Sequence, residues 1–167
     1  GGYDLPPVMF NEQEIEALVL GVRIVEAWAD PKLARSAEGV LAKVEEVIPD
    51  RLRRHMAETA LLAPADHLAE PITIDPGDLR LAIRDRRIVH LQYRDAEDRL
   101  SERDVWPLGM AFFGPVWILA SWCELRQGFR SFRLDRMSAI TVLDNTFEPK
   151  PDKTIEKFLN SGWVKQA

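Results

Sequence analysis

The chain has 167 residues, of which 46% are hydrophobic and 29% are charged, a composition typical of a folded protein rather than a disordered one. No apolar run approaches the roughly 20 residues that a bilayer-spanning helix needs, and the first residues lack the basic and apolar parts of a signal peptide. A single cysteine excludes an internal disulfide framework and an all-cysteine zinc site. We therefore expect a cytoplasmic protein without a membrane partner.

Charge is distributed unevenly along the sequence. Residues 1–78 contain 7 basic and 15 acidic side chains, whereas residues 79–137 contain 11 basic and 8 acidic ones. All of the basic residues in the second segment are arginines. Because the planar guanidinium group matches a carboxylate or phosphate bidentately, this segment is expected to meet an anion, unless its arginines only solvate strand edges and pair with local acids.

The first third of the chain predicts a small helical unit. Asn11 and Glu14 have capping-box spacing, and apolar residues at helical period follow to Ala29. Asp30 and Pro31 predict the start of a second helix, which Pro49 ends. A short third helix is expected from Asp50 to about Glu58. Since Gly1 to Pro7 has no initiator methionine, we expect a fragment that follows a missing element.

A connector and one further helix come next. Three prolines between residues 60 and 76 predict a mostly irregular connector, with a short strand at Ile72 to Ile74. Asp75-Pro76 is expected to open a helix to about Arg87.

From Ile88 onward the hydrophobic period changes to two, which predicts a series of short strands. Expected strands cover residues 88–94, 100–106, 108–113, 116–123, 129–134 and 140–143. Turns separate most of them, and Pro107 permits a bend between the second and third. Short strands at this spacing predict a small barrel, and Thr154 to Leu159 is expected to form a terminal helix.

Enzyme signatures are absent from the sequence. It has no phosphate-binding Gly-rich loop, HExxH or GxSxG motif. We expect the three histidines to be ordinary surface or interface residues, Cys123 to be a core thiol, and Asp95, Glu97 and Asp98 to form a solvated hairpin tip. No catalytic residue, metal or cofactor is predicted.

Arginines and a serine on separate strands give the main functional hypothesis. Ser101 and Arg103 share one strand face by the two-residue period, and Ser131 and Arg133 share a face of a later strand. If Ser101, Arg103 and Arg133 face each other across the barrel, they form a cleft for phosphate or a nucleic-acid backbone. The alternative is pairing of Arg103 with Glu102 or Asp104, and of Arg133 or Arg136 with Asp135, but such in-strand pairs are expected to be poorly placed.

These blocks also resemble a known family. The segments 101–103, 105–109, 117–123, 125–126 and 130–137, read as SER, VWPLG, WILASWC, LR and RSFRLDRM, are similar in order and spacing to the WYL domain. The stretch 4–10 and the helix beyond it resemble the segment after the winged helix-turn-helix of YafY-like bacterial regulators.

The resemblance implies a fold, a function and a set of binding residues. WYL domains are Sm-like, SH3-type β-barrels that sense effectors in bacterial transcription factors, and single-stranded DNA or a nucleotide is the proposed effector in some. By the family motif, the ligand-binding candidates are Ser101, Arg103, Arg126, Arg133, Ile118, Arg130 and Arg136. Ile118 stands where the family has its namesake tyrosine, so the phenolic donor and its stacking surface are missing there.

The resulting prediction is an α+β regulator fragment. It comprises a helical linker and dimerisation unit (1–62), a connector (63–76), a WYL barrel (77–147) and a C-terminal tail with a short helix (148–167). We expect a homodimer that binds single-stranded DNA, a nucleotide or an oligonucleotide, and that contacts operator DNA through a missing N-terminal domain. The alternatives are an oligomerisation scaffold without a ligand, and a nucleotide hydrolase that uses His90.

Overall fold

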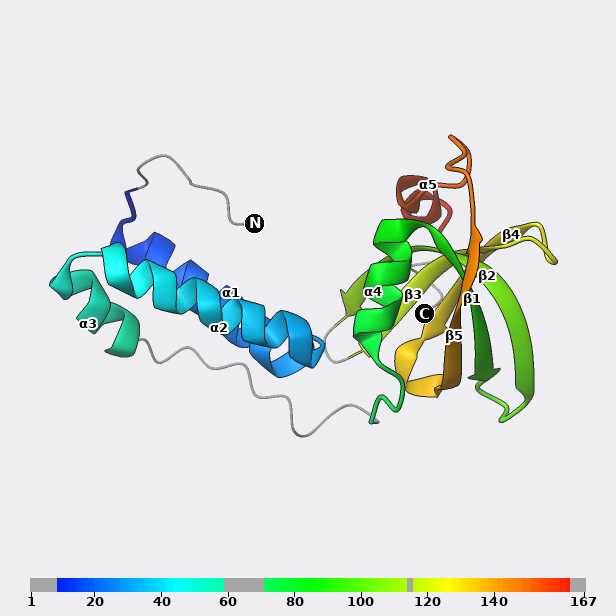
Figure 1. The fold of residues 1–167 in the computed structure, drawn as a ribbon, viewed down its shortest axis with the longest axis horizontal. Coiled ribbons are helices and arrows are strands. Elements are labelled where there is room, and N and C mark those ends of the chain that lie inside the picture. Colours follow the sequence, from blue (N-terminus) through cyan, green and yellow to red (C-terminus); the bar gives the residue numbers. More distant parts are fainter. Residues whose placement is uncertain (1–8, 59–70, 114–115, 163–167) are drawn as a thin grey trace. The chain divides into compact units, whose positions relative to one another are not determined.

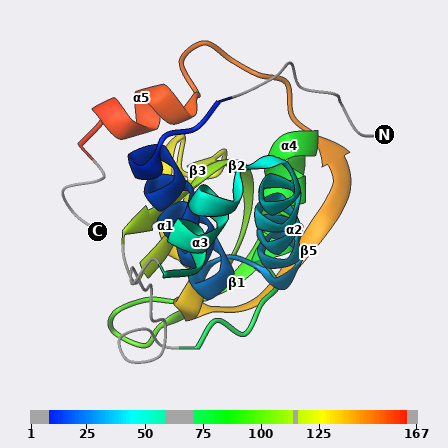
Figure 2. The ribbon, with the colours of Figure 1, turned by 90° about the vertical axis from the view of Figure 1, so that its left-hand side faces the viewer.

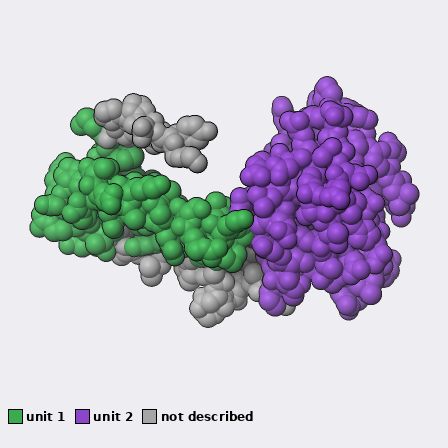
Figure 3. Space-filling view, viewed as in Figure 1, with its two compact units in different colours: residues 1–65 green, residues 66–167 purple. Residues whose placement is uncertain are grey.

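The chain divides into two compact units, residues 1–65 and residues 66–167 (Figure 3). The computed structural model describes residues 9–58, 71–113 and 116–162. Each unit has a separate cluster of buried apolar side chains. The finer limits predicted from the sequence, at residues 62, 76 and 147, stay predictions.

Within residues 9–58, the described part of the first unit, the chain forms α1 (Glu12–Trp28), α2 (Pro31–Val47) and α3 (Asp50–Glu58). The predicted capping box is confirmed, because the Glu14 amide donates to Asn11 Oδ1 at 2.9 Å and the Asn11 amide donates to Glu14 Oε2 at 2.8 Å. Asp30 caps α2 by accepting from the amides of Lys32 and Leu33 at 3.1 Å. Polar caps thus fix both long helices at the predicted residues.

α1 packs against both α2 and α3 (Figure 2), and the core of the first unit lies between α1, α3 and the end of α2. Its buried residues are Ile15, Val19, Ile48, Leu52 and Met56. His55 on α3 contacts Glu16 on α1, with Nε2 and Oε1 2.9 Å apart. His55 therefore serves a structural contact between two helices, in agreement with its expected role as an interface residue.

The second unit combines two helices with an antiparallel sheet (Figure 1). Its elements are α4 (Pro76–Asp85), β1 (Arg87–Arg94), β2 (Leu100–Phe113), β3 (Val116–Cys123), β4 (Gly128–Arg133), a 3-10 turn η1 (Leu134–Arg136), β5 (Met137–Thr146) and α5 (Ile155–Asn160). The strand order is β4-β3-β2-β1-β5. The α+β class predicted from the sequence is therefore confirmed.

Two of the strand predictions need correction. Residues 72–74 form no strand; Ile72 and Ile74 instead pack against the core of this unit. The two strands predicted on either side of Pro107 are one continuous β2, because a register shift between Pro107 and Gly109 lets the strand continue past the proline. Proline is tolerated at such an irregularity because no regular ladder hydrogen bond is lost there.

The predicted barrel closure is not confirmed. β4 and β5 lie at the two ends of the strand order, and among the described strands no pairing joins them. Residues 100–105 of β2 pair with β1, whereas residues 106–113 pair with β3. The result is an open sheet in which β2 changes its neighbour halfway along its length.

One side of the sheet, called here the inner face, carries the core. It is defined by the buried side chains of Val89, Leu91, Val105, Leu119 and Phe132. α4 covers part of this core through Leu79 and Ala82 and contacts β1, β2 and β5. Cys123 is also fully buried in this cluster, as expected for a core thiol.

The opposite side, called here the outer face, is covered in part by α5. Gly109 lies there, and a Cβ atom at this position would be only 2.9 Å from Ile155 Cδ1. Ile118 and Ala120 on β3 are also buried, which explains why almost the whole of this strand is apolar. The prediction of a strand covered on both faces is thus confirmed.

We predict that Leu119→Ala destabilises the second unit by about 2–5 kcal/mol, because it removes a fully buried side chain and leaves a cavity. The measurement is urea unfolding followed by tryptophan fluorescence. Leu125→Ala is the matched control, since Leu125 is 81% exposed in the turn after the same strand and should change stability by under about 0.5 kcal/mol. Equal effects of both changes would contradict this placement of the core.

Candidate functional site

Arg103 is the predicted binding residue with the most unusual environment. It pairs with Leu91 across β1 and β2 and lies two residues before buried Val105, so the strand period places it on the inner face. Its Nε atom is buried and has no hydrogen-bond partner among the described residues. A buried donor of this kind costs about 1–3 kcal/mol when it is left unsatisfied, a cost that an ordered water or a bound ligand offsets.

The neighbouring acids do not neutralise Arg103. Glu102 accepts a hydrogen bond of 2.9 Å from Gln92, and Asp104 lies 2.7 Å from His90 Nδ1. Both acids occupy the alternate strand positions, which face away from Arg103. The expectation that in-strand pairing of Arg103 is poorly placed is therefore confirmed.

Ser101 and Tyr93 extend the same face beside Arg103. They are cross-strand partners in the β1–β2 ladder, and both are half-buried. The Tyr93 ring packs edge-on against Phe132 with centroids 4.9 Å apart, and its hydroxyl accepts a long hydrogen bond of 3.4 Å from the Arg133 amide. A hydroxyl, a phenol and a guanidinium group thus line this part of the inner face.

Arg133 is engaged by the protein itself. Its Nε and Nη2 atoms donate to the two carboxylate oxygens of Asp135 at 3.0 and 2.6 Å, and the Asp135 side chain is only 7% exposed. The expectation that this pair is poorly placed is wrong, because β4 ends at Arg133 and η1 turns Asp135 back toward it. In addition, Arg133 pairs with Ile118 in the ladder, out of phase with core residue Phe132. Register therefore does not bring Arg133 to the face of Arg103.

The other candidates are spread over the β3–β4 hairpin and η1. Arg130 is half-buried on β4, and its Nη1 donates to the Phe129 carbonyl at 2.6 Å. Arg126 is exposed in the preceding turn, Arg136 is half-buried at the end of η1, and Ile118 is buried. The geometry brings together Ser101 and Arg103 but does not gather the full predicted set. Ligand binding by that set stays a prediction.

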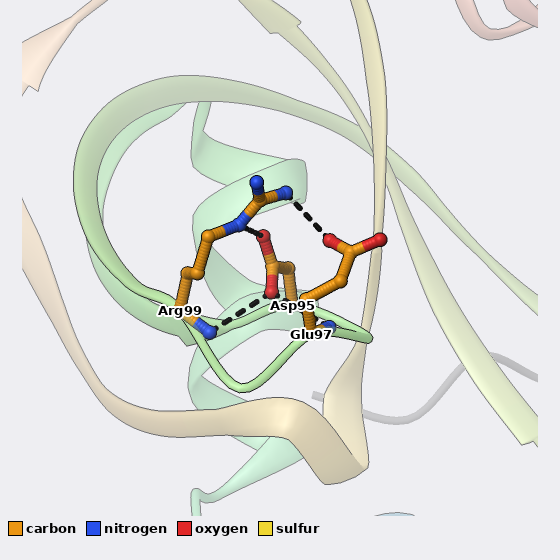
Figure 4. Close-up of polar contacts among 3 residues, drawn as sticks. All are labelled: Asp95, Glu97 and Arg99. Atoms are coloured by element: carbon orange, nitrogen blue, oxygen red, sulfur yellow. Dashed lines mark hydrogen bonds and ion pairs between the residues drawn. The ribbon is translucent and has the colours of Figure 1, made fainter.

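The acidic β1–β2 hairpin is closed by its own arginine (Figure 4). Asp95 accepts from the amides of Glu97 and Arg99 at 2.9 Å, and the Arg99 side chain bonds both Asp95 at 2.8 Å and Glu97 at 2.5 Å. Hydrogen bonds from Arg99, first from its backbone, lower the pKa of Asp95. These contacts show that Asp95 and Glu97 stabilise a turn, as the sequence predicts.

His90 lies in an acidic setting on the outer face of β1. Asp104 is 2.7 Å from its Nδ1 and Glu102 is 3.9 Å from its Nε2. The register puts His90 out of phase with Leu91, the partner of Arg103. His90 and Arg103 thus face opposite sides, and the arrangement needed for the hydrolase alternative is not formed by this pair.

Tyr93 is the residue that the sequence analysis missed. It was assigned only to an alternating strand, although the hairpin at residues 95–98 and the two-residue period are enough to place it opposite Ser101. Tyr93 thus places a phenol on the inner face, whereas Ile118 lies on the outer face. Residues 9–58, 71–113 and 116–162 contain no cluster of three or more His, Cys, Asp or Glu that could hold a metal ion.

The described helices include none that is both long and apolar enough to span a bilayer.

Comparisons with known proteins found the following similarities. Residues 77–142 match the family model of the WYL domain. The chain is 33% identical over 85 residues to the DNA-binding transcriptional repressor CapW of Stenotrophomonas maltophilia, a match that covers 49% of this chain and 26% of the relative. A solved structure, proteasome accessory factor B/C of Arthrobacter aurescens, is 26% identical with a TM-score of 0.42 and covers 86% of this chain and 22% of that one.

The second unit is thus an α+β domain with an antiparallel sheet that carries an arginine on its inner face. Residues 77–142 are a WYL domain, and the prediction of this domain is confirmed. The chain spans about a quarter of the length of each of these two relatives.

We predict that Asp135→Asn destabilises the WYL domain by about 1–2 kcal/mol, because it leaves half-buried Arg133 without its bidentate partner; partial exposure of Arg133 reduces the cost below that of a fully buried pair. Thermal unfolding provides the measurement. Asp144→Asn is the matched control, since Asp144 pairs with Arg87 at 2.7 Å but is fully exposed. A control variant as unstable as Asp135→Asn would contradict a special role for the buried carboxylate.

Proposed function

We propose that this chain is the effector-sensing region of a bacterial DNA-binding transcriptional regulator. One relative is named a DNA-binding transcriptional repressor, which supports a role in transcription. The effector is an anion, such as single-stranded DNA, a nucleotide or an oligonucleotide, that binds beside Arg103. Operator DNA is contacted by a separate domain.

The buried Nε atom of Arg103 is the observation that carries this proposal. A phosphate oxygen would supply the acceptor that the described residues do not, in a charge-assisted hydrogen bond. Ser101 and Tyr93 stand beside it on the same face and offer hydroxyl groups to the same ligand. Arg133 is the weaker candidate, because Asp135 already pairs with its guanidinium group.

The Tyr93 ring adds a means of signalling. It contacts Phe132, and its hydroxyl reaches the backbone of Arg133, where β4 passes into η1. A ligand that draws the phenol toward Arg103 would alter this contact and shift the population of two arrangements of the domain. Coupling of this kind changes ligand and operator affinity reciprocally.

We predict that Arg103→Ala weakens binding of a fluorescein-labelled single-stranded oligonucleotide by about 10-fold or more, the loss expected for one charge-assisted contact. Fluorescence anisotropy at two salt concentrations measures this, and wild-type affinity should fall steeply with salt. Arg84→Ala removes the same charge from an exposed arginine paired with Asp85 and should leave affinity unchanged.

The scaffold alternative makes the opposite prediction. Absence of salt-dependent binding to the oligonucleotide and to nucleotides, or equal losses in Arg103→Ala and Arg84→Ala, would reject the effector proposal. A ligand-free oligomerisation module would then be the better account, and the internal neutralisation of Arg133 already favours that account at one position.

We further propose that the first unit forms a homodimer through an apolar groove between α1 and α2. The groove has a volume of about 480 Å³ and is lined by Ala17, Leu18, Gly21, Val22, Val25, Leu33, Ser36, Ala37 and Val40. Nearly all of these residues are apolar, and Val40 is 44% exposed. Contiguous apolar surface of this kind is typical of an interaction site, and a second copy of the unit presents the same surface, as a two-fold dimer requires.

We predict that Val40→Glu converts the dimer into a monomer, because a charge in a desolvated interface is costly. Light scattering coupled to gel filtration measures the mass. Val47→Glu is the matched control on the same helix, since Val47 is 78% exposed and does not line the groove. A monomeric wild-type chain, or a control that dissociates equally, would contradict the proposal.

A further inference from the structure

Lys153 is held in an aromatic site on the outer face of the WYL domain. Its Nζ atom lies 4.3 Å from the centroid of the Trp122 ring and 4.9 Å from that of Trp106. Glu124 is its counter-ion at 3.3 Å, and the Lys153 side chain is only 9% exposed. Lysine is almost never buried unless it is paired, so these contacts constitute a specific site for its ammonium group.

The walls of this site, called here the cation cage, belong to the sheet. Trp106 on β2 and Trp122 on β3 are direct cross-strand partners. Phe129 packs edge-on against Trp122 at 5.3 Å, and Phe147 stacks on Trp106 at 5.0 Å. The sheet therefore orients two large aromatic rings for cation–π contact, which is the usual means of recognising an alkylammonium group.

The cation cage also includes the carboxylate of Glu124, in the β3–β4 turn. A hydrogen bond from Gln127, followed by the interactions with Lys153 and Lys150, lowers the pKa of Glu124. The negative charge beside the two rings is therefore maintained at neutral pH. Lys150 lies at the edge of the cage, 5.6 Å from the Trp106 centroid.

The segment that supplies Lys153 is held against the sheet by side-chain contacts. It leaves β5 and turns back toward the sheet, where it ends in α5 (Figure 1). α5 has only six residues, too few to be stable as an isolated helix. Its attachment rests on Phe158, which is buried against Phe129 at 6.0 Å, and on Ile155 against Gly109.

We propose that the cation cage is a binding site for an alkylammonium group, that Lys153 is its resident ligand, and that this contact latches residues 148–160 onto the outer face. Opening of the latch detaches the segment as one unit, because α5 does not persist without its packing. The open state frees the cage for an external alkylammonium. The proposal does not depend on what Arg103 binds.

Opening of the latch changes which side chains the outer face exposes. Gly109, beneath Ile155, pairs with Ala120, and Ala120 pairs with Ser131. Arg133 lies two residues beyond Ser131 on the same strand face. Detachment of the segment therefore uncovers Gly109 and the aromatic side chains of the outer face.

Hydrogen–deuterium exchange of the full chain tests the latch. Lys153→Met keeps the length of the side chain but removes its charge, and it should speed exchange of the α5 amides by about 10-fold, the effect of one desolvated cation–π contact. Lys153→Arg should restore most of the protection. Lys157→Met is the matched control, since Lys157 lies on α5 and is exposed. Unchanged β1 exchange verifies the fold.

Two results of the exchange experiment would overturn the proposed latch. One is unchanged α5 exchange in the Lys150→Met/Lys153→Met double variant, which leaves neither nearby ammonium group to occupy the cage. The other is equal acceleration in Lys153→Met and Lys157→Met, which would assign the effect to general destabilisation of the segment.

A chemical test addresses the ligand class. Lys153→Ala lacks the atoms of a propylammonium ion, so n-propylammonium chloride should produce a saturable change in tryptophan fluorescence and slow α5 exchange in this variant. Sodium chloride at equal ionic strength controls for screening. The wild-type chain should respond less, because tethered Lys153 competes at high effective concentration. A response no larger than that to sodium chloride would reject the cation cage.

Discussion

The alternation of side chains along β2 is the constraint on which the functional argument rests. Val105 must face the core, and the strand period then forces Arg103 to face the same way. Folding the domain therefore desolvates part of a guanidinium group, a cost that no described residue offsets at Nε. The packed sheet around Arg103 supplies the free energy that holds this donor in place. An anion that reaches it would gain from a polar group that is already oriented and dehydrated.

Local patterns in the sequence were sufficient to predict most of the helices and strands. The capping residues Asn11 and Asp30 act within one turn of themselves, so their effect can be read without knowledge of the tertiary structure. Pro107 was misread because a proline inside a strand normally ends it, and the register shift that accommodates it depends on the partner strand. Likewise, Ile72 and Ile74 alternate as in a strand but serve to anchor the connector to the core.

The candidate site was harder to predict than the fold. The strand period alone places Ser101 and Arg103 side by side on one face, whereas the position of the Arg133 side chain depends on how β4 ends. The turn at η1 brings Asp135 to Arg133, and this contact cannot be inferred from strand alternation. The cation cage also escaped prediction, since Lys153 and the two tryptophans come from distant segments that only the sheet register brings together. Contacts between elements thus set the limit of sequence interpretation.

The long β2 strand divides the sheet of the WYL domain into two parts. Its first half pairs only with β1 and its second half only with β3, and the register shift lies just past this exchange of neighbours. The domain accordingly contains two half-sheets that share one strand, β2. Arg103 lies in the part of β2 that pairs with β1 and Trp106 in the part that pairs with β3, three residues apart. A change in the angle between the half-sheets would therefore alter the surroundings of Arg103 on the inner face and of Trp106 on the outer face at the same time.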